Sequence, residues 1–339
     1  MRSTVRNGQR GFSLVEITVV LAIVSALMIL TYRMIQETMT ATLFNESHND
    51  LAVMSQQAVN AIQTELLQTK LVYEDDATGN AYRTALKFAS PAAVWTSSVL
   101  PVMDSTTAVF KPDTAKDRFT GNSLLFVRQM PPLSIVYDDD GVAGTPEVEL
   151  LADRYRFEYI YLRRETRQSF AGSGESADLM FATSAEYADY FQLAAIKAKP
   201  GTVVSKLIAA GLKRAWDPGK PLNQAFYALS AATDGTFDPA INKPDIDVAK
   251  TRTLLRGLIG AHISGKMAYS VAFATFPIPQ PLSVFAKPQA ALPGFPSGFE
   301  VKVIGPAGNR QVLTRIVLMA NYGRTFEAQQ ATVVTAARF

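Results

Sequence analysis

The sequence predicts an α+β fold in which a long N-terminal α-helix, transmembrane in its first part, packs on an antiparallel β-sheet head with a helical insertion. Three observations predict this fold. An unbroken apolar run lies near the N-terminus, the next residues place apolar side chains at helical spacing, and much of the remaining chain alternates short strand-like segments with turns that contain glycine or proline.

The N-terminal apolar run has the length of a membrane-spanning helix. From Phe12 to Leu30 it covers 19 residues, and a helix needs about 20 to cross a bilayer. Arg2, Arg6 and Arg10 precede it, which predicts a cytoplasmic N-terminus and an exported remainder. No small-residue cleavage site follows Leu30, so the run differs from an ordinary secretory signal.

Glu16 is an unusual residue within this run. A carboxylate at the centre of a membrane helix costs about 2.5–3.5 kcal/mol, so it needs either a partner or a function. The string Gly11-Phe12-Ser13-Leu14-Val15-Glu16, behind a basic leader, resembles the processing site of type IV prepilins. The resemblance covers roughly residues 1–45.

This resemblance implies a processing route and an assembly role. In prepilins a membrane peptidase cuts after the glycine and methylates the new N-terminal phenylalanine, which here implies cleavage between Gly11 and Phe12 and N-methylation of Phe12. The glutamate, here Glu16, pairs with the N-terminal amine of a neighbouring subunit. A carboxylate buried in an apolar helix is stabilised when an ammonium group pairs with it. The charge of each subunit would therefore be compensated only when that subunit docks on another.

The helix is expected to continue as a stem. No proline occurs before Pro91, and the stretch from Phe12 to Ala77 lacks glycine. We therefore expect one helix from about Phe12 to about Tyr73, about 90 Å long. Its second half is amphipathic, and a coiled-coil dimer is the alternative for that half because the stripe only approximates a heptad. The stripe consists of Leu51, Met54, Ala58, Ile62 and Leu66.

The head is expected to be a mostly antiparallel sheet. Tyr155 to Leu162 alternates aromatic residues with others in strict period two, and Gly305 to Arg310 predicts a hairpin turn between two strands. Ala177–Lys199, Val203–Trp216 and Val248–His262 have helical spacing, which predicts the insertion. The expected organisation is a leader peptide at 1–11, a transmembrane or filament-core helix at 12–32, an amphipathic stem at 33–75, β-rich head at 76–164 and 266–339, and a mainly helical insertion at 165–265.

The size of the head is similar to that of minor pilins. This resemblance implies a position at or near the tip of a pilus, where minor pilins prime assembly. The arrangement is most similar to PilW-like minor pilins or to J-type pseudopilins of type II secretion. K-type pseudopilins share a large helical insertion but typically lack the glutamate that this chain keeps at Glu16. A membrane-anchored enzyme or binding module with a prepilin-like N-terminus is a further alternative.

The implied partners are other minor and major pilins or pseudopilins, prepilin peptidase, the inner-membrane assembly platform and, as an option, a tip adhesin; no nucleic acid is expected. The implied location is the inner membrane before assembly, and the periplasm or the cell surface afterwards. The charge agrees with this, because +3 overall comes entirely from the three leader arginines and leaves 30 basic against 30 acidic residues.

Candidate chemistry beyond the N-terminus is sparse. The chain has no cysteine and only two histidines, His48 and His262, and we expect no catalytic activity and no cofactor. Two acidic loops could bind calcium through hard oxygen ligands, although a hairpin turn explains the first more simply. Their residues are Asp138, Asp139 and Asp140 in the first loop, and Asp234, Asp238, Asp245 and Asp247 in the second.

Overall fold

The computed structural model describes residues 13–88, 98–104, 121–138, 146–170, 174–195, 200–229, 244–255, 259–262, 265–271, 299–306, 308–322 and 325–337. The chain divides into two compact units, Met1–Asp50 and Leu51–Phe339. The first helix, α1 (Leu14–Leu66), contributes to both units. The predicted leader and Phe12 lie outside the described residues.

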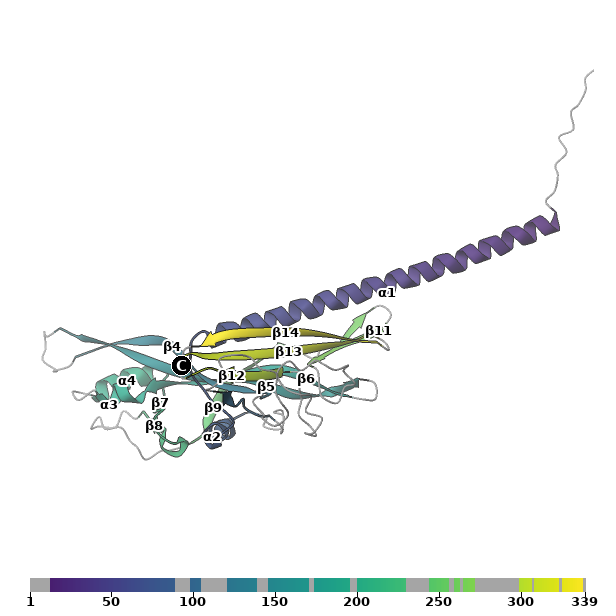
Figure 1. The fold of residues 1–339 in the computed structure, drawn as a ribbon. Coiled ribbons are helices and arrows are strands. Elements are labelled where there is room, and N and C mark those ends of the chain that lie inside the picture. The colour runs from purple at the N-terminus through teal and green to yellow at the C-terminus, as the bar shows by residue number, and fades with distance from the viewer. Residues whose placement is uncertain are drawn as a thin grey trace, which may run out of the picture. The chain divides into compact units, whose positions relative to one another are not determined.

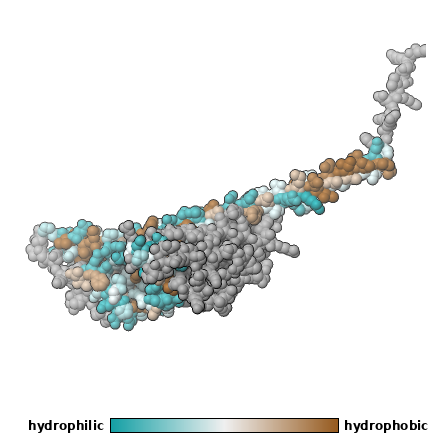
Figure 2. Space-filling view, in the orientation of Figure 1, coloured by the Kyte–Doolittle hydropathy of each residue, from teal (hydrophilic) through white to brown (hydrophobic). Residues whose placement is uncertain are grey.

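Within the first unit, the described residues of α1 bury no apolar side chain. Its segment Leu14–Glu46 is long and apolar enough to cross a membrane. All side chains at 13–42 are exposed in the isolated chain, and Figure 2 shows the hydrophobic ones gathered along the first part of the helix. This surface needs lipid or other subunits to cover it.

The second unit contains two sheets (Figure 1). In the described residues the larger sheet has eight strands in the order β1-β4-β5-β6-β7-β8, with β9 also paired to β6 and β2 paired to β9. Most pairs are antiparallel, whereas β6–β7 and β2–β9 are parallel. The strands are β1 (Thr69–Val72), β2 (Leu86–Lys87), β4 (Leu124–Tyr137), β5 (Val148–Phe170), β6 (Gly174–Asp189), β7 (Arg214–Trp216), β8 (Phe226–Ala228) and β9 (Ile246–Leu255).

The smaller sheet is formed mainly by the C-terminal part of the chain. Its order is β10-β11-β13-β12-β3, and β14 pairs with β13 along the whole length of both strands. The strands are β3 (Met103–Asp104), β10 (Ile259–His262), β11 (Gly265–Val271), β12 (Phe299–Ile304), β13 (Arg310–Tyr322) and β14 (Thr325–Ala337). The predicted turn between β12 and β13 is confirmed, and Gly305 and Gly308 adopt φ values of 101° and 81° that favour glycine there.

An isolated bridge joins the two sheets. Just before β4, the N–H of Gly121 donates to the carbonyl of Val301 in β12 at 2.9 Å, and the reverse bond is 2.8 Å. A Cβ atom on Gly121 would lie 2.5 Å from the backbone nitrogen of Pro101, so only glycine lets the backbones approach this closely. The bridge thus ties the chain just before β4 to strand β12 of the smaller sheet.

The predicted alternation of β5 is confirmed. Tyr155, Phe157, Tyr159 and Tyr161 all enter one aromatic core with residues from other elements, among them Trp216. The opposite face of β5 is also buried, since Glu158 and Ile160 are both 0% exposed. A strand that neighbours cover on both faces is the central element of the head. The other contributors to the core include Tyr73, Tyr82, Met180, Tyr187 and Phe226.

The prediction of a mainly helical insertion at 165–265 is wrong. Ala177–Lys199 lies largely in β6, and Val248–His262 lies in β9 and β10. Only two short α-helices form in the described part of this region, α3 (Tyr190–Ala195) and α4 (Pro200–Ala209), with the 3-10 turn η2 (Leu222–Gln224). The reason is that β6 pairs with β5 and β9 along its two edges, and its residues 179–182 are buried on both faces. Periodicity cannot tell such a short apolar run from part of a helix.

Two shorter corrections concern the end of the stem. The helix ends at Leu66 rather than near Tyr73, because Thr69–Val72 pairs with β4 as strand β1. The segment Thr84–Phe88 has strand-like alternation but is divided. Thr84 and Ala85 end the helix α2 (Ala77–Ala85), and Leu86–Lys87 forms the short strand β2. The Asp76 side chain caps α2 by accepting from the N–H of Gly79 at 2.6 Å. The predicted domain boundaries themselves stay predictions.

Candidate functional site

The first turn of α1 contains a reciprocal pair of capping hydrogen bonds. Ser13 precedes the helix, and its hydroxyl accepts from the N–H of Val15 at 3.2 Å. The carboxylate of Glu16 reaches back and accepts from the N–H of Ser13 at 2.9 Å. This is a capping box, which satisfies two of the donors that a helix start leaves without partners. Glu16 therefore has an intrahelical partner in the isolated chain.

Helix polarity adds to this arrangement. The unpaired N–H groups at a helix start carry partial positive charge, so an acidic side chain in the first turn is stabilised there. Two threonines of the apolar segment, Thr18 and Thr31, satisfy their hydroxyls by donating to the carbonyls four residues earlier, at 2.7 Å and 2.8 Å. These two hydroxyls are thus satisfied within the helix, which suits a low-dielectric surrounding.

The remaining predicted site residues fall into two groups. Gly11, Phe12, Asp139, Asp140, Asp234 and Asp238 lie outside the described residues. Asp138 directly follows β4, which pairs with β5 through Tyr137 and Val148. Asp245 forms an ion pair with Lys87 at 3.3 Å, and Asp247 lies 4.0 Å from Arg214. The described residues bring no three acidic or histidine side chains together around a metal position, and calcium binding stays a prediction.

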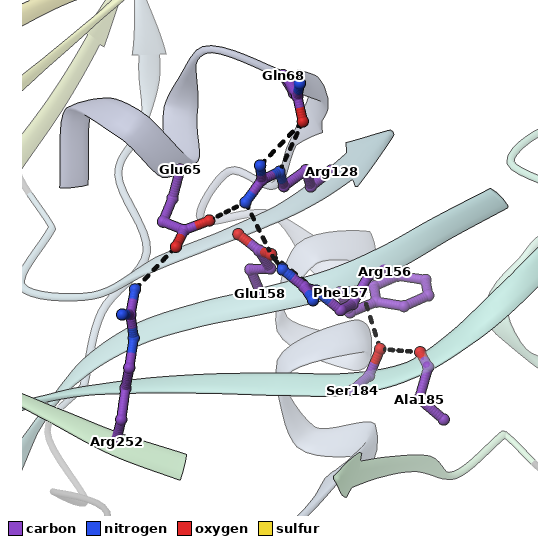
Figure 3. Close-up of polar contacts among 9 residues, drawn as sticks. All are labelled: Glu65, Gln68, Arg128, Arg156, Phe157, Glu158, Ser184, Ala185 and Arg252. Carbon is purple, nitrogen blue, oxygen red and sulfur yellow. Dashed lines mark hydrogen bonds and ion pairs between the residues drawn. The ribbon is translucent and has the colours of Figure 1, made fainter. Parts of the chain in front are cut away.

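A polar cluster in the head was not predicted from the sequence (Figure 3). Glu65, on the last turn of α1, accepts hydrogen bonds from Arg128 of β4 and, at 2.8 Å, from Arg252 of β9. Arg128 also donates to the side chain of Gln68 at 3.1 Å and 2.9 Å. Three segments far apart in sequence are therefore tied together at the point where the helix ends.

Glu158 is the buried acid of this cluster. One of its oxygens, Oε1, accepts from Nε of Arg156 at 2.9 Å and lies 3.9 Å from Arg128. Its other oxygen, Oε2, is buried and has no hydrogen-bond partner. Burial raises the pKa of Glu158 to about 7, although the guanidinium group of Arg156 lowers it. The signal that could have found this site is the Arg156–Glu158 pair on the non-aromatic face of β5.

The comparison with protein families agrees with the N-terminal geometry. Residues 6–32 match the prokaryotic N-terminal methylation motif. The motif indicates a type IV pilin-like or pseudopilin protein that prepilin peptidase processes, and with the apolar helix it fits an inner-membrane anchor. No curated protein and no solved structure matches the chain.

Proposed function

We propose that the chain is a minor pilin, cleaved after Gly11, N-methylated on Phe12 and incorporated at or near the tip of a type IV pilus to prime assembly. The observation that carries the proposal is the methylation motif at residues 6–32, which continues into one helix whose first turn contains Glu16. In this role Glu16 exchanges its intrahelical bond to Ser13 for the N-terminal ammonium group of another subunit.

The large head supports a minor rather than a major subunit. The unit Leu51–Phe339 carries two sheets, and a major pilin is about half as long as this chain. A J-type pseudopilin of type II secretion has the same N-terminal chemistry and is the second candidate. The K-type alternative loses its main support, because the helical insertion on which the likeness rested is formed largely by strands.

Membrane orientation and partners follow from the same proposal. The arginines at positions 2, 6 and 10 keep the N-terminus in the cytoplasm, and the head is exported to the periplasm or the cell surface. The subunit meets prepilin peptidase and the assembly platform in the inner membrane, and pilins or pseudopilins through α1. The role is structural rather than catalytic.

Mass spectrometry of the natural, mature chain tests the proposal. We expect the N-terminal peptide to begin with N-methylated Phe12. A mature chain that still begins with Met1 would instead support a membrane-anchored enzyme or binding module. A neighbouring gene set for pilus assembly, as opposed to a secretion operon, would separate the pilus subunit from the pseudopilin.

A further inference from the structure

A hollow of about 440 Å³ lies beside the polar cluster of the head, and we call it the Arg252 hollow. Four elements contribute to its wall: α1 through Glu65, β5 through Arg156, β6 through Phe181 and Thr183, and β9 through the three consecutive residues 250–252. The hollow is partly open to solvent, so a group from outside the chain can reach it.

The wall of the Arg252 hollow has an excess of positive charge. Its cations are Arg156, Lys250 and Arg252, and its single carboxylate is that of Glu65. Both oxygens of this carboxylate are already occupied, one by Arg128 and one by Arg252. Lys250 is exposed and forms no ion pair with any described residue. Arg156 is itself paired with the buried carboxylate of Glu158. Counted together with Arg128, the region holds four cations and two carboxylates, and this excess of positive charge beside a concave surface attracts an anion.

Arg252 is held in place before any ligand arrives. Its guanidinium lies 4.8 Å from the ring centroid of Phe181, and one of its nitrogens donates to Glu65 at 2.8 Å. A guanidinium group has five N–H donors, so most of its donors remain for a further acceptor. Because the ring and the carboxylate already fix the side chain, binding an anion costs little side-chain entropy.

Two β-bulges converge on the wall of the hollow. On β6 an extra residue lies between Thr183 and Glu186, opposite β5, and the hydroxyl of Ser184 accepts from the N–H of Phe157 at 2.9 Å (Figure 3). On β9 the register shifts again where Thr183 pairs with Lys250. Bulges re-aim side chains and are common beside binding sites. One bulge lies on the β5 side of Thr183 and the other on its β9 side. The regular pleat of the sheet is therefore interrupted where the hollow forms.

From these observations we infer that the Arg252 hollow binds a carboxylate from an acidic side chain of a second pilin-like subunit. Lys250 and Arg252 provide the charge, and the hydroxyl of Thr183 provides a neutral donor. The inference rests on the proposed function for the identity of the partner. The chemistry of the hollow does not depend on it.

Binding of an acidic peptide tests the chemistry directly. A labelled hexa-glutamate peptide is titrated into the purified full-length chain in detergent at constant ionic strength, and binding is followed by fluorescence anisotropy. We expect saturable binding that Lys250→Glu weakens by roughly tenfold or more, the equivalent of one charge-assisted hydrogen bond. Lys250→Arg should retain it. Lys220→Glu, the same charge change in the turn between β7 and η2, should leave it unchanged.

Several results would overturn the inference. They are the absence of saturable binding, an equal loss in the Lys220→Glu control, or inorganic phosphate binding as tightly as the peptide. Lys250 is exposed, and Lys250→Glu should therefore leave thermal stability close to that of the unmodified chain, which a melting curve checks.

Cross-linking in the natural host tests the partner. A photoreactive residue at position 251 should cross-link to a second pilin-like subunit, identified by mass spectrometry, and Lys250→Glu should abolish that product. If Phe12 is methylated but the cross-link goes only to proteins without a methylation motif, the inference fails while the proposed function stands. If Phe12 is not exposed by cleavage, the proposed function fails, and peptide binding still decides the chemistry of the hollow.

Discussion

At the scale of single residues, two glutamates illustrate opposite ways of placing a carboxylate in an apolar setting. Glu16 stands at the start of a helix, where a backbone N–H and the helix polarity stabilise its charge. Glu158 is fully buried beside Arg156 and keeps one oxygen without a partner. The first carboxylate is free to change partners, whereas the second is fixed within a cluster and carries a desolvation cost.

Removing the Ser13 hydroxyl should loosen the first turn of α1. Ser13→Ala removes the acceptor for the N–H of Val15, and loss of such a cap costs about 1 kcal/mol. Hydrogen exchange of the purified full-length chain in detergent should show faster exchange at the first turn. Ser13→Thr keeps a hydroxyl and should behave like the unmodified chain. Equal exchange in the alanine variant would show that the hydroxyl contributes nothing there.

The titration of Glu158 should lower the free energy of unfolding of the head as the pH rises. The pKa of Glu158 is about 7 in the folded chain against an ordinary value of 4.5, so between these values the folded state binds more protons than the unfolded state. This contribution is present below pH 4.5, is lost as the pH rises to 7, and amounts to about 3 kcal/mol.

Urea unfolding of Glu158→Gln at pH 5 and pH 8 measures this effect, with the buried Trp216 as a fluorescence probe. We expect a smaller change in stability between the two pH values than in the unmodified chain. Glu186→Gln is the control, because Glu186 is partly exposed in its ion pair with Arg154. A pH dependence that is the same in Glu158→Gln and the unmodified chain would contradict the assignment to this carboxyl group.

At the scale of elements, α1 serves two environments with one continuous helix. Its residues before position 43 expose their side chains, whereas Ala58, Ile62 and Leu66 are buried within the second unit. These three positions are four residues apart, so they form one stripe along the helix. The coiled-coil alternative for the stem is less well supported, because the head itself already covers this stripe.

Shortening a side chain of this stripe should destabilise the head. Ile62 is 0% exposed, and Ile62→Ala should lower the free energy of unfolding by about 2–5 kcal/mol through lost burial and a residual cavity. The neighbouring Gln63 is exposed, so Gln63→Ala should change the stability by no more than about 0.5 kcal/mol. Urea unfolding measures both. Similar losses in the two variants would mean that the stripe is not part of the core.

At the scale of the whole molecule, assembly is the property on which the proposed function depends. Glu16→Ala keeps the Gly11–Phe12 junction but removes the carboxylate that would pair with another subunit. We expect the variant to be cleaved and methylated normally, yet to give few filaments by electron microscopy of the natural host. Glu16→Asp keeps the charge on a shorter side chain and should retain part of the activity. Normal filament numbers in the alanine variant would rule out the pairing role.

Local sequence was enough wherever short-range physics decides the structure. The apolar run with its arginines predicts the membrane-competent helix, strict alternation from Tyr155 to Leu162 predicts β5, and Gly305 with Gly308 predicts the turn before β13. Each of these follows from hydropathy, strand periodicity or backbone φ, all of which are properties of neighbouring residues. The methylation motif at residues 6–32 is local in the same sense.

Only the tertiary structure decided the region after β5 and the polar cluster. Leu179 and Phe181 lie in an apolar run that suits a helix or a buried strand, and it becomes a strand because β5 and β9 pair with it on both sides. Glu65, Arg128 and Arg252 come together from three elements. Their attraction depends on distances through space, which spacing along the chain does not encode. The sequence therefore predicts the membrane-competent helix but not the charged cluster in the head.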